Sequence, residues 1–241
     1  MRISIFTLCF IFWNTCFAGF WRTAWQDFIS PVTTDAKYYL YGGSLLTIGF
    51  TIDGIEDSLG HDVQDETTEN KPLGDASKIF DLAGQMIPNA IYAGTMYGLY
   101  LYNDELSYKK KTVHMIKSTV YSGLVANVLK KTIREPRPNL SNSRESFPSG
   151  HTTTAFAFAS VVGTEHEWYW GVAAYSMASL VAYSRINDNA HRLHDVVGGA
   201  VLGLSYGLSI HYLYKDEKSE VAKFSLIPYA DGLLIGYRTE F

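Results

Sequence analysis

The sequence predicts an all-α protein, a multi-helix bundle followed by a short C-terminal β-hairpin. Three observations predict this fold class. Apolar residues recur at helical spacing, polar or proline-containing stretches separate the apolar segments, and only the end of the chain alternates as a strand does. The 241 residues are 47% hydrophobic and 18% charged, which excludes intrinsic disorder. The net charge of −4 argues against nucleic acid as a partner.

The first 18 residues have the features of a secretory signal peptide. Arg2 precedes an apolar run over residues 3–13, and this run is shorter than the ~20 residues that a membrane span needs. The alternative is an N-terminal anchor that is not cleaved. Both cysteines, Cys9 and Cys16, lie here, so cleavage after Ala18 would leave a chain without disulfides.

Residues 19–74 form an N-terminal helical and acidic segment. An apolar, tyrosine-rich stretch over residues 35–51 predicts a helix, which Gly42-Gly43 weakens. Residues 53–69 contain seven acidic residues and no lysine or arginine. They lack the ligand pattern of a calcium loop, and we therefore predict a solvated loop.

Residues 75–214 form the main helical domain. One helix in its centre is defined by an apolar stripe, which consists of Val113, Ile116, Val120, Leu124 and Val128. The predicted helices are 75–102 (with a break near Pro88), 113–130, 151–163, 167–184 and 190–214. Residues 132–150 contain three prolines and predict a loop.

The C-terminal tail, residues 215–241, differs from the rest. Two short β-prone runs, 223–228 and 233–241, flank a turn and predict a hairpin. The alternating apolar residues that end at Phe241 are similar to the last strand of an outer-membrane barrel, but one hairpin cannot close a barrel. We predict that the hairpin packs or docks against another surface.

Residues suited to phosphate chemistry lie at the ends of four successive predicted helices. In an antiparallel bundle these four ends meet, because alternate termini share one end. The sequence therefore predicts one pocket. The residues expected to meet there are Lys130, Arg137, His151, Arg185, His191 and Asp195.

Three cationic side chains make this pocket an anion site. Arg137 and Arg185 can each donate two parallel hydrogen bonds to a phosphoryl group, and Lys130 adds a point charge. Ser149 and Gly150 stand at a helix start, where free N–H groups and the helix dipole favour phosphate. Zinc also binds His and Asp, but three cations disfavour a dication, so we predict no metal.

The two histidines of the pocket are assigned different roles. His191 and Asp195 are four residues apart on one predicted helix, so the carboxylate can keep one ring nitrogen protonated and leave the other free to attack. His151 lies on another helix and suits a general acid for the leaving oxygen. His194 points about 100° away from Asp195 around the helix, and we expect no direct role for it.

Three motifs in this domain together resemble the signature of the type 2 phosphatidic acid phosphatase family, which shares its core with vanadium haloperoxidases and class A acid phosphatases. The residues that match are Lys130, Arg137, Pro138, Pro148, Ser149, Gly150, His151, Ser184, Arg185, His191 and Asp195, with no departure in spacing. The resemblance covers about residues 75–214. It implies a helical bundle, a phosphohistidine on His191 and no metal or other cofactor.

The residues and the resemblance together predict a metal-independent phosphatase of the bacterial envelope that acts on a lipid phosphate or lipid pyrophosphate. Undecaprenyl pyrophosphate, phosphatidylglycerol phosphate and a lipid A phosphate are not distinguished by the sequence. The alternatives are a soluble periplasmic acid phosphatase of broad specificity, a lipid phosphotransferase, a vanadate haloperoxidase and a non-catalytic envelope lipid-binding protein.

The last predicted helix has features of a membrane span. Gly199, Gly203 and Gly207 recur at steps of four and let another helix approach closely, and residues 196–214 are long and apolar enough to span. Residues 109–111, three lysines, lie at the end opposite the pocket, so a spanning bundle would place the pocket outside the cytoplasm. We predict an inner-membrane protein with a periplasmic active site, or a periplasmic protein.

Overall fold

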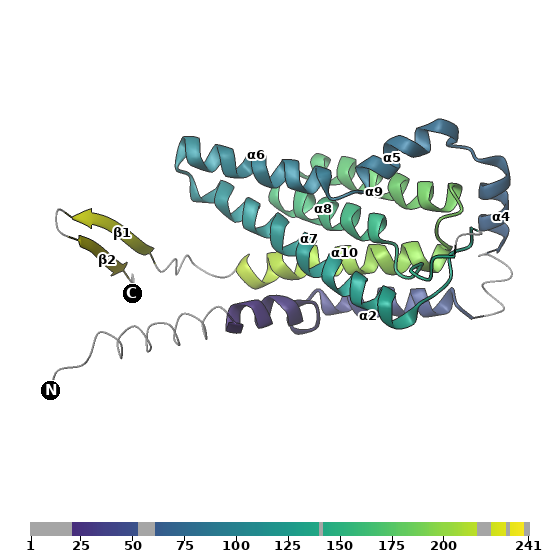
Figure 1. Ribbon diagram of the computed structural model, residues 1–241, viewed down its shortest axis with the longest axis horizontal. Helices are drawn as coiled ribbons and strands as arrows, with labels where there is room; N and C mark the ends of the chain where they lie inside the picture. Colours follow the sequence, from purple (N-terminus) through teal and green to yellow (C-terminus); the bar gives the residue numbers. More distant parts are fainter. Residues whose placement is uncertain (1–20, 53–60, 140–141, 216–222, 230–231, 239–241) are drawn as a thin grey trace.

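The computed structural model describes residues 21–52, 61–139, 142–215, 223–229 and 232–238, and these residues form a bundle of antiparallel helices (Figure 1). The helices are α2 (Lys37–Gly49), α4 (His61–Asn70), α5 (Ser77–Ala83), α6 (Ile87–Asn103), α7 (Leu106–Ile133), α8 (Gly150–Glu165), α9 (Trp168–Asn187) and α10 (Leu193–Lys215). A short 3₁₀ helix, η2 (Gly74–Ala76), precedes α5, and residues 21–33 are also helical. The prediction of a helical bundle is confirmed. The predicted signal peptide lies outside the described residues.

Helix α8 occupies the centre of the bundle and packs against α7, α9 and α10. Its closest neighbour is α10, whose glycines face it. A Cβ added at Gly203 would overlap the carbonyl oxygen of Thr153, and one added at Gly207 would overlap Cβ of Ser160. The predicted close approach at these glycines is therefore confirmed, and any larger residue would push the two helices apart.

Helix α7 buries its polar face and exposes its apolar one. The stripe that predicted the helix is on the outside, where its residues are 39–56% exposed: Val113, Ile116, Val120, Leu124 and Val128. Ser118 and Ser122, on the opposite face, are fully buried. In a soluble protein large apolar side chains normally lie inside, so this pattern is inverted.

Some helix boundaries differ from the prediction. The break near Pro88 is formed by residues 84–86, and Pro88 itself lies in the first turn of α6, where proline is tolerated. Helix α7 begins at Leu106, so the three lysines at 109–111 are part of the helix. The helix formed by residues 21–33 was not predicted.

The prediction of a solvated loop over residues 53–69 is wrong for its second half. Residues 61–70 form α4, which packs against α9. Nε2 of Gln64 donates a hydrogen bond of 2.7 Å to Oδ1 of Asn189, so this helix is held over the segment that leads into α10. Acidic composition alone does not prevent a helix when a tertiary contact stabilises it. Residues 53–60 lie outside the described residues.

The two strands near the end of the chain are β1 (Lys223–Tyr229) and β2 (Gly232–Arg238). They pair antiparallel, with Leu226 opposite Ile235. The prediction that this tail docks against another surface stays a prediction.

Candidate active site

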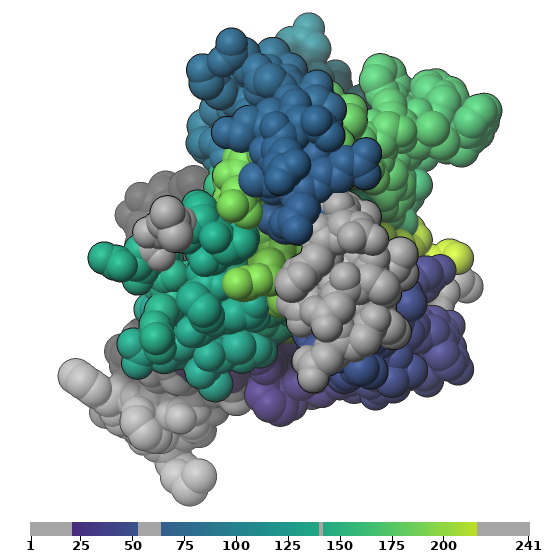
Figure 2. Space-filling view, turned by 90° about the vertical axis from the view of Figure 1, so that its right-hand side faces the viewer, coloured from purple at the N-terminus to yellow at the C-terminus, as the bar shows by residue number. Residues whose placement is uncertain are grey.

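The end of α7, the start of α8, the end of α9 and the start of α10 lie at the same end of the bundle, on the right in Figure 1. The backbone N–H of Ser149 donates to the carbonyl oxygen of Asp195 over 2.9 Å, which ties the start of α8 to the start of α10. Figure 2 looks onto this end, where the lime residues that lead into α10 lie between the teal end of α7 and the blue segment of α4 and α5.

His191 and Asp195 form a pair. Nδ1 of His191 lies 3.5 Å from Oδ2 of Asp195, although His191 precedes α10 instead of beginning it as predicted. The same carboxylate oxygen accepts hydrogen bonds from Oγ of Ser146 (2.6 Å) and from the N–H of Arg192 (2.8 Å). Because Nδ1 faces Asp195, Nε2 is the ring nitrogen left for attack on a ligand.

Ser146 contacts both residues of this pair, and the sequence did not predict this contact. Its Oγ lies 3.4 Å from Nδ1 of His191 as well as 2.6 Å from Asp195, and it is fully buried. Ser146 therefore fixes the carboxylate and limits how the imidazole can turn. A serine in a loop of mixed polar residues gives no signal of this role in the sequence.

Burial determines the protonation state of His191. The side chain is 2% exposed, and burial lowers its pKa to about 4, while the hydrogen bond to Asp195 acts in the opposite direction. The positive charges of Lys130 and Arg137 lower the pKa further. The imidazole is therefore neutral, and able to act as a nucleophile, at mildly acidic as well as neutral pH.

This low pKa predicts an unusual pH profile. His191 loses its nucleophilic form as the pH falls through its pKa, so the acid limb of phosphoenzyme formation should be centred near pH 4 instead of near 6.5. The measurement is kcat/KM for phosphoenzyme formation from p-nitrophenyl phosphate, corrected for ionisation of the substrate. An acid limb centred at 6.5 or above would contradict a neutral, buried nucleophile.

The cationic residues predicted from the sequence lie around the same position. Nζ of Lys130 donates to the carbonyl oxygens of Glu145 (2.6 Å) and Ser146 (3.2 Å). Its Cε is 3.8 Å from where a Cβ on Gly150 would stand, so the lysine reaches the start of α8. Nε of Arg137 and Nε of Arg185 are buried, and neither has a hydrogen-bond partner in the described parts of the chain. Two buried donors without an acceptor suit an anionic ligand.

Ser149 and Gly150 contribute differently from each other. The side chain of Ser149 caps α8, since its Oγ accepts a hydrogen bond from the backbone N–H of Thr152 over 3.5 Å. The N–H of Ser149 donates to the carbonyl oxygen of Asp195. Ser149 therefore shapes the helix start, and because its Oγ only accepts in its bonds from the N–H and hydroxyl of Thr152, its hydroxyl hydrogen remains able to donate. The first-turn N–H groups of Gly150 and His151 have no acceptor inside the helix, which leaves them for a phosphoryl oxygen.

Asp81 on α5 is a second residue that the sequence did not reveal. Its Oδ1 accepts a hydrogen bond from Nη1 of Arg185 and lies 3.3 Å from Nε2 of His151, without hydrogen-bond geometry to the imidazole. Gly84, at the end of α5, allows this approach, because a Cβ there would come within 2.8 Å of Cβ of His151. No motif contains Asp81, and only the packing of α5 brings it here.

Asp81→Asn should separate binding from turnover. Removing the negative charge beside Arg185 should let an oxyanion bind more tightly, while His151 loses the charge that favours its protonated form. We expect the Ki for vanadate to fall several-fold and kcat on an alkyl phosphate to fall by about tenfold, a fraction of the usual worth of acid catalysis. Steady-state kinetics with vanadate as inhibitor measures both. A rise in Ki would show that Asp81 organises the anion site instead of competing for it.

His194 and Glu135 belong to the framework of the site. Nε2 of His194 lies 2.8 Å from Oε1 of Glu135, and Nη1 of Arg192 donates to the same oxygen over 3.1 Å. Glu135, His194 and Asp195 together form a group of side chains of the types that bind metal ions. The guanidinium of Arg192 already binds Glu135, and the hydroxyl of Ser146 already binds Asp195, so both carboxylates are less available to a divalent metal ion. The positive charges of Lys130, Arg137 and Arg185 also disfavour such an ion.

The fold and this site define a class of protein, a helical bundle with a buried histidine and cationic side chains at one end. Residues 111–219 match the model of the PAP2 superfamily. The chain is therefore similar to the PAP2 superfamily through this region.

Similar curated proteins were found in two bacterial genera. Over 89 residues the chain is 39% identical to the lipid A 1-phosphatase of Porphyromonas gingivalis, and this alignment covers 35% of this chain and 20% of that protein. Over 115 residues it is 30% identical to the lipid A 1-phosphatase of Rhizobium etli, and this alignment covers 42% of this chain and 49% of that protein. The matches thus span between a fifth and a half of the length of these relatives.

Two solved structures have a similar fold. LpxE of Aquifex aeolicus superposes with a TM-score of 0.54 at 25% identity, over 66% of this chain and 99% of that chain. The transmembrane PAP2-type phosphatidylglycerolphosphate phosphatase of Bacillus subtilis superposes with a TM-score of 0.62 at 19% identity, over 80% of this chain and 99% of that chain. The second likeness concerns the fold alone.

Proposed function

We propose that this chain is a membrane-embedded lipid phosphatase that works through a phosphohistidine on His191 and needs no metal ion for the chemical step. The observation that carries the proposal is the arrangement of His191: its Nδ1 faces Asp195 at 3.5 Å, and the two arginines beside it have buried donors without a partner among the described residues. A neutral imidazole oriented by a carboxylate next to an anion site is suited to phosphoryl transfer.

The reaction consists of two displacements. Nε2 of His191 attacks the phosphorus, the bond to the lipid oxygen breaks, and that oxygen takes a proton from His151. Water then attacks the phosphohistidine, His151 accepts the proton of the water, and inorganic phosphate leaves with His191 restored. Lys130, Arg137 and Arg185 balance the charge on the phosphoryl oxygens in both steps.

The exposed surface supports a location within a membrane. Besides the apolar stripe on α7, large apolar residues are exposed on α2, α6 and α9, among them Leu45, Ile91 and Val172. Lys117, the one lysine among residues 113–128 of α7, has its Nζ 2.8 Å from the buried carboxylate of Asp27, so its charge is paired inside the bundle. Of the described helices, α10 alone is long and apolar enough to span by composition, and it is mostly buried.

Aromatic and basic residues support an orientation in that membrane. Trp168, Tyr169 and Trp170 are exposed at the start of α9, the end of the bundle away from His191, where aromatic rings suit the boundary between lipid and water. Residues 109–111, three consecutive lysines near the start of α7, lie at the same end and favour the cytoplasmic side. The active site would then face the opposite side of the membrane.

A basic cavity next to the site supports a substrate with more than one anionic group. The cavity has a volume of about 430 Å³ and is lined by Lys130, Lys131, Arg134, Asn142, Ser143, Arg144 and Glu145. Lys130 belongs to both this cavity and the phosphate site. Lipid A 1-phosphate is our leading candidate, since two curated relatives are lipid A 1-phosphatases.

Arg144→Ala tests the role of this cavity in substrate binding. The exposed guanidinium can pair with a second phosphate of the substrate, so we expect KM for bis-phosphorylated lipid A to rise by about fivefold, the worth of one exposed ion pair. KM for p-nitrophenyl phosphate should not change. Lys110→Ala, which removes an exposed base at the other end of α7, is the matched control. Equal effects on both substrates would contradict the proposal for the cavity.

Release of inorganic phosphate from a panel of substrates tests the proposed function. The panel contains lipid A 1-phosphate, phosphatidylglycerol phosphate, undecaprenyl pyrophosphate and soluble esters, each with and without EDTA in the same detergent. We expect lipid phosphates to be preferred and EDTA not to stop the chemical step. Activity confined to soluble esters would favour a broad acid phosphatase, and transfer to added alcohol instead of water would favour a phosphotransferase.

A further inference from the structure

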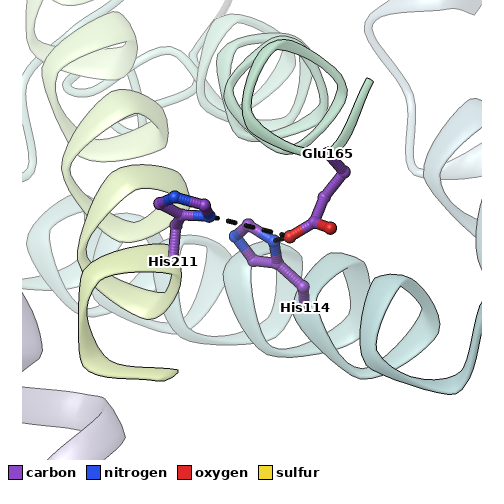
Figure 3. A group of neighbouring side chains, drawn as sticks. All are labelled: His114, Glu165 and His211. Carbon is purple, nitrogen blue, oxygen red and sulfur yellow. Dashed lines mark hydrogen bonds and ion pairs between the residues drawn. The ribbon is translucent and has the colours of Figure 1, made fainter. Parts of the chain in front are cut away.

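Three side chains at the end of the bundle opposite the active site point toward one another (Figure 3). They are His114 on α7, Glu165 at the end of α8 and His211 on α10. His114 is sixteen residues before Lys130 on the same helix, which corresponds to about 24 Å. The cluster is therefore separate from the phosphate site, and the proposed reaction does not use it.

The donor atoms of these residues converge. Nδ1 of His114 lies 2.8 Å from Oε1 of Glu165, and Nδ1 of His211 lies 3.7 Å from the same oxygen. Each of the three residues offers one ligand atom that lies within 4.8 Å of the ligand atoms of the other two. Two ligand atoms on a tetrahedral zinc ion are about 3.4 Å apart, given metal–ligand bonds of about 2.1 Å. The distances from Oε1 of Glu165 to the two histidine nitrogens, 2.8 and 3.7 Å, lie on either side of that value, so the three side chains need only small shifts to surround one ion.

The second nitrogen of His114 supports a metal site. Nε2 lies 2.8 Å from the carbonyl oxygen of Gly207, which only accepts, so Nε2 must carry a proton and donate. In a neutral ring Nδ1 then has a lone pair directed at Glu165 and His211. A metal-binding histidine commonly donates its other N–H to a backbone carbonyl in this way. Without an ion, a proton must lie between Nδ1 of His114 and Oε1 of Glu165 to make their 2.8 Å contact a hydrogen bond.

Exposure and charge are compatible with an ion that enters from the surface. The side chain of His114 is 6% exposed, whereas those of Glu165 and His211 are 21% and 24% exposed. The outer two residues thus leave a route to the inner one. Lys111 and Lys215 add positive charge nearby, so affinity must come from the three coordinating atoms.

We propose that His114, Glu165 and His211 bind one zinc ion, with water as the fourth ligand, and that this ion fastens α7, α8 and α10 together. Two imidazoles and one carboxylate form a donor set that zinc accepts. The ion would be structural, because it lies too far from the phosphate site to touch a substrate. It is therefore compatible with a chemical step that needs no metal.

Zinc titration of the full-length chain in detergent, after removal of metals with EDTA, tests this proposal. We expect one equivalent to bind, a rise in Tm on zinc addition, and a cobalt-substituted form with the absorption of a tetrahedral site. His211→Ala and Glu165→Gln should each weaken binding by at least tenfold and abolish the rise in Tm. Because His211 is partly exposed, its variant should still fold even if a change at buried His114 does not.

Two control variants identify the site. His166→Ala removes a neighbouring imidazole whose Nε2 faces the hydroxyl of Tyr92 at 2.8 Å, and His194→Ala removes the histidine of the Glu135 group beside the active site. Both should keep the bound zinc. Absence of zinc binding in the wild type would overturn the proposal. Loss of zinc in His194→Ala, or unchanged binding in His211→Ala, would overturn it as well.

Discussion

His191→Ala should abolish turnover of every substrate and form no phosphoenzyme, whereas the loss in His151→Ala should depend on the leaving group. The covalent step requires Nε2 of His191 whichever group departs. His151 donates a proton to the leaving oxygen, and that proton matters for the alkoxide of a lipid ester but little for a nitrophenolate. His151→Ala should therefore lose about 10²–10⁴ in rate on alkyl phosphates and much less in phosphoenzyme formation from p-nitrophenyl phosphate.

Pulse labelling with radioactive phosphate, followed by an acid-lability assay, measures this difference in both variants with both leaving groups. The phosphoenzyme of His151→Ala should accumulate, because the same residue activates the water of the second step. Labelling of His191→Ala would show that another residue is the nucleophile. An equal loss with both leaving groups in His151→Ala would contradict its role as the acid.

Asp195→Asn should keep the fold and lower kcat strongly. The carboxylate faces Nδ1 of His191 and accepts hydrogen bonds from Ser146 and Arg192, so an amide would retain part of this network but lose the charge that stabilises the imidazolium. In the catalytic triad of serine proteases, where a carboxylate orients a histidine in the same way, this change costs about 10⁴ in rate. We expect a loss of about 10³ or more here.

Ser146→Ala and His194→Ala are the controls for Asp195→Asn. Ser146→Ala removes one hydrogen bond to the carboxylate but not its charge, so the loss should be about tenfold. His194→Ala should be mild, because its Nε2 faces Glu135. Steady-state kinetics with circular dichroism as the test of folding measures all three variants. Turnover of Asp195→Asn within twofold of wild type, or a loss in His194→Ala equal to that in His191→Ala, would contradict the assignment of the pair.

The helices and the position of the site were largely predictable from the sequence. Apolar spacing and proline-containing breaks are local signals, and they located the helices from α6 to α10. Most of the predicted helix ends lie within a few residues of the observed ones. The antiparallel order of these helices then required their charged ends to meet. His191 shows the limit of such reasoning, because it lies just before α10 and still reaches Asp195.

The direction in which a helix faces was not predictable. The apolar stripe of α7 identified the helix, but periodicity is the same whether the stripe faces a protein core or a lipid. Only the packing of α7 against α8 and α10 decided that Ser118 and Ser122 face inward. The membrane location we propose depends on this inversion.

By itself, the sequence determined which residues meet at the proposed phosphate site, because their spacing places them at helix ends that short connections bring together. The tertiary structure alone decided which partners complete it. Asp81 lies beside His151, and Ser146 donates to Asp195, although each pair is distant in the sequence. His114, Glu165 and His211 come from three different helices and meet in one cluster. These contacts depend on how whole helices pack, and a single carboxylate or hydroxyl carries no local signal of the neighbour it will meet.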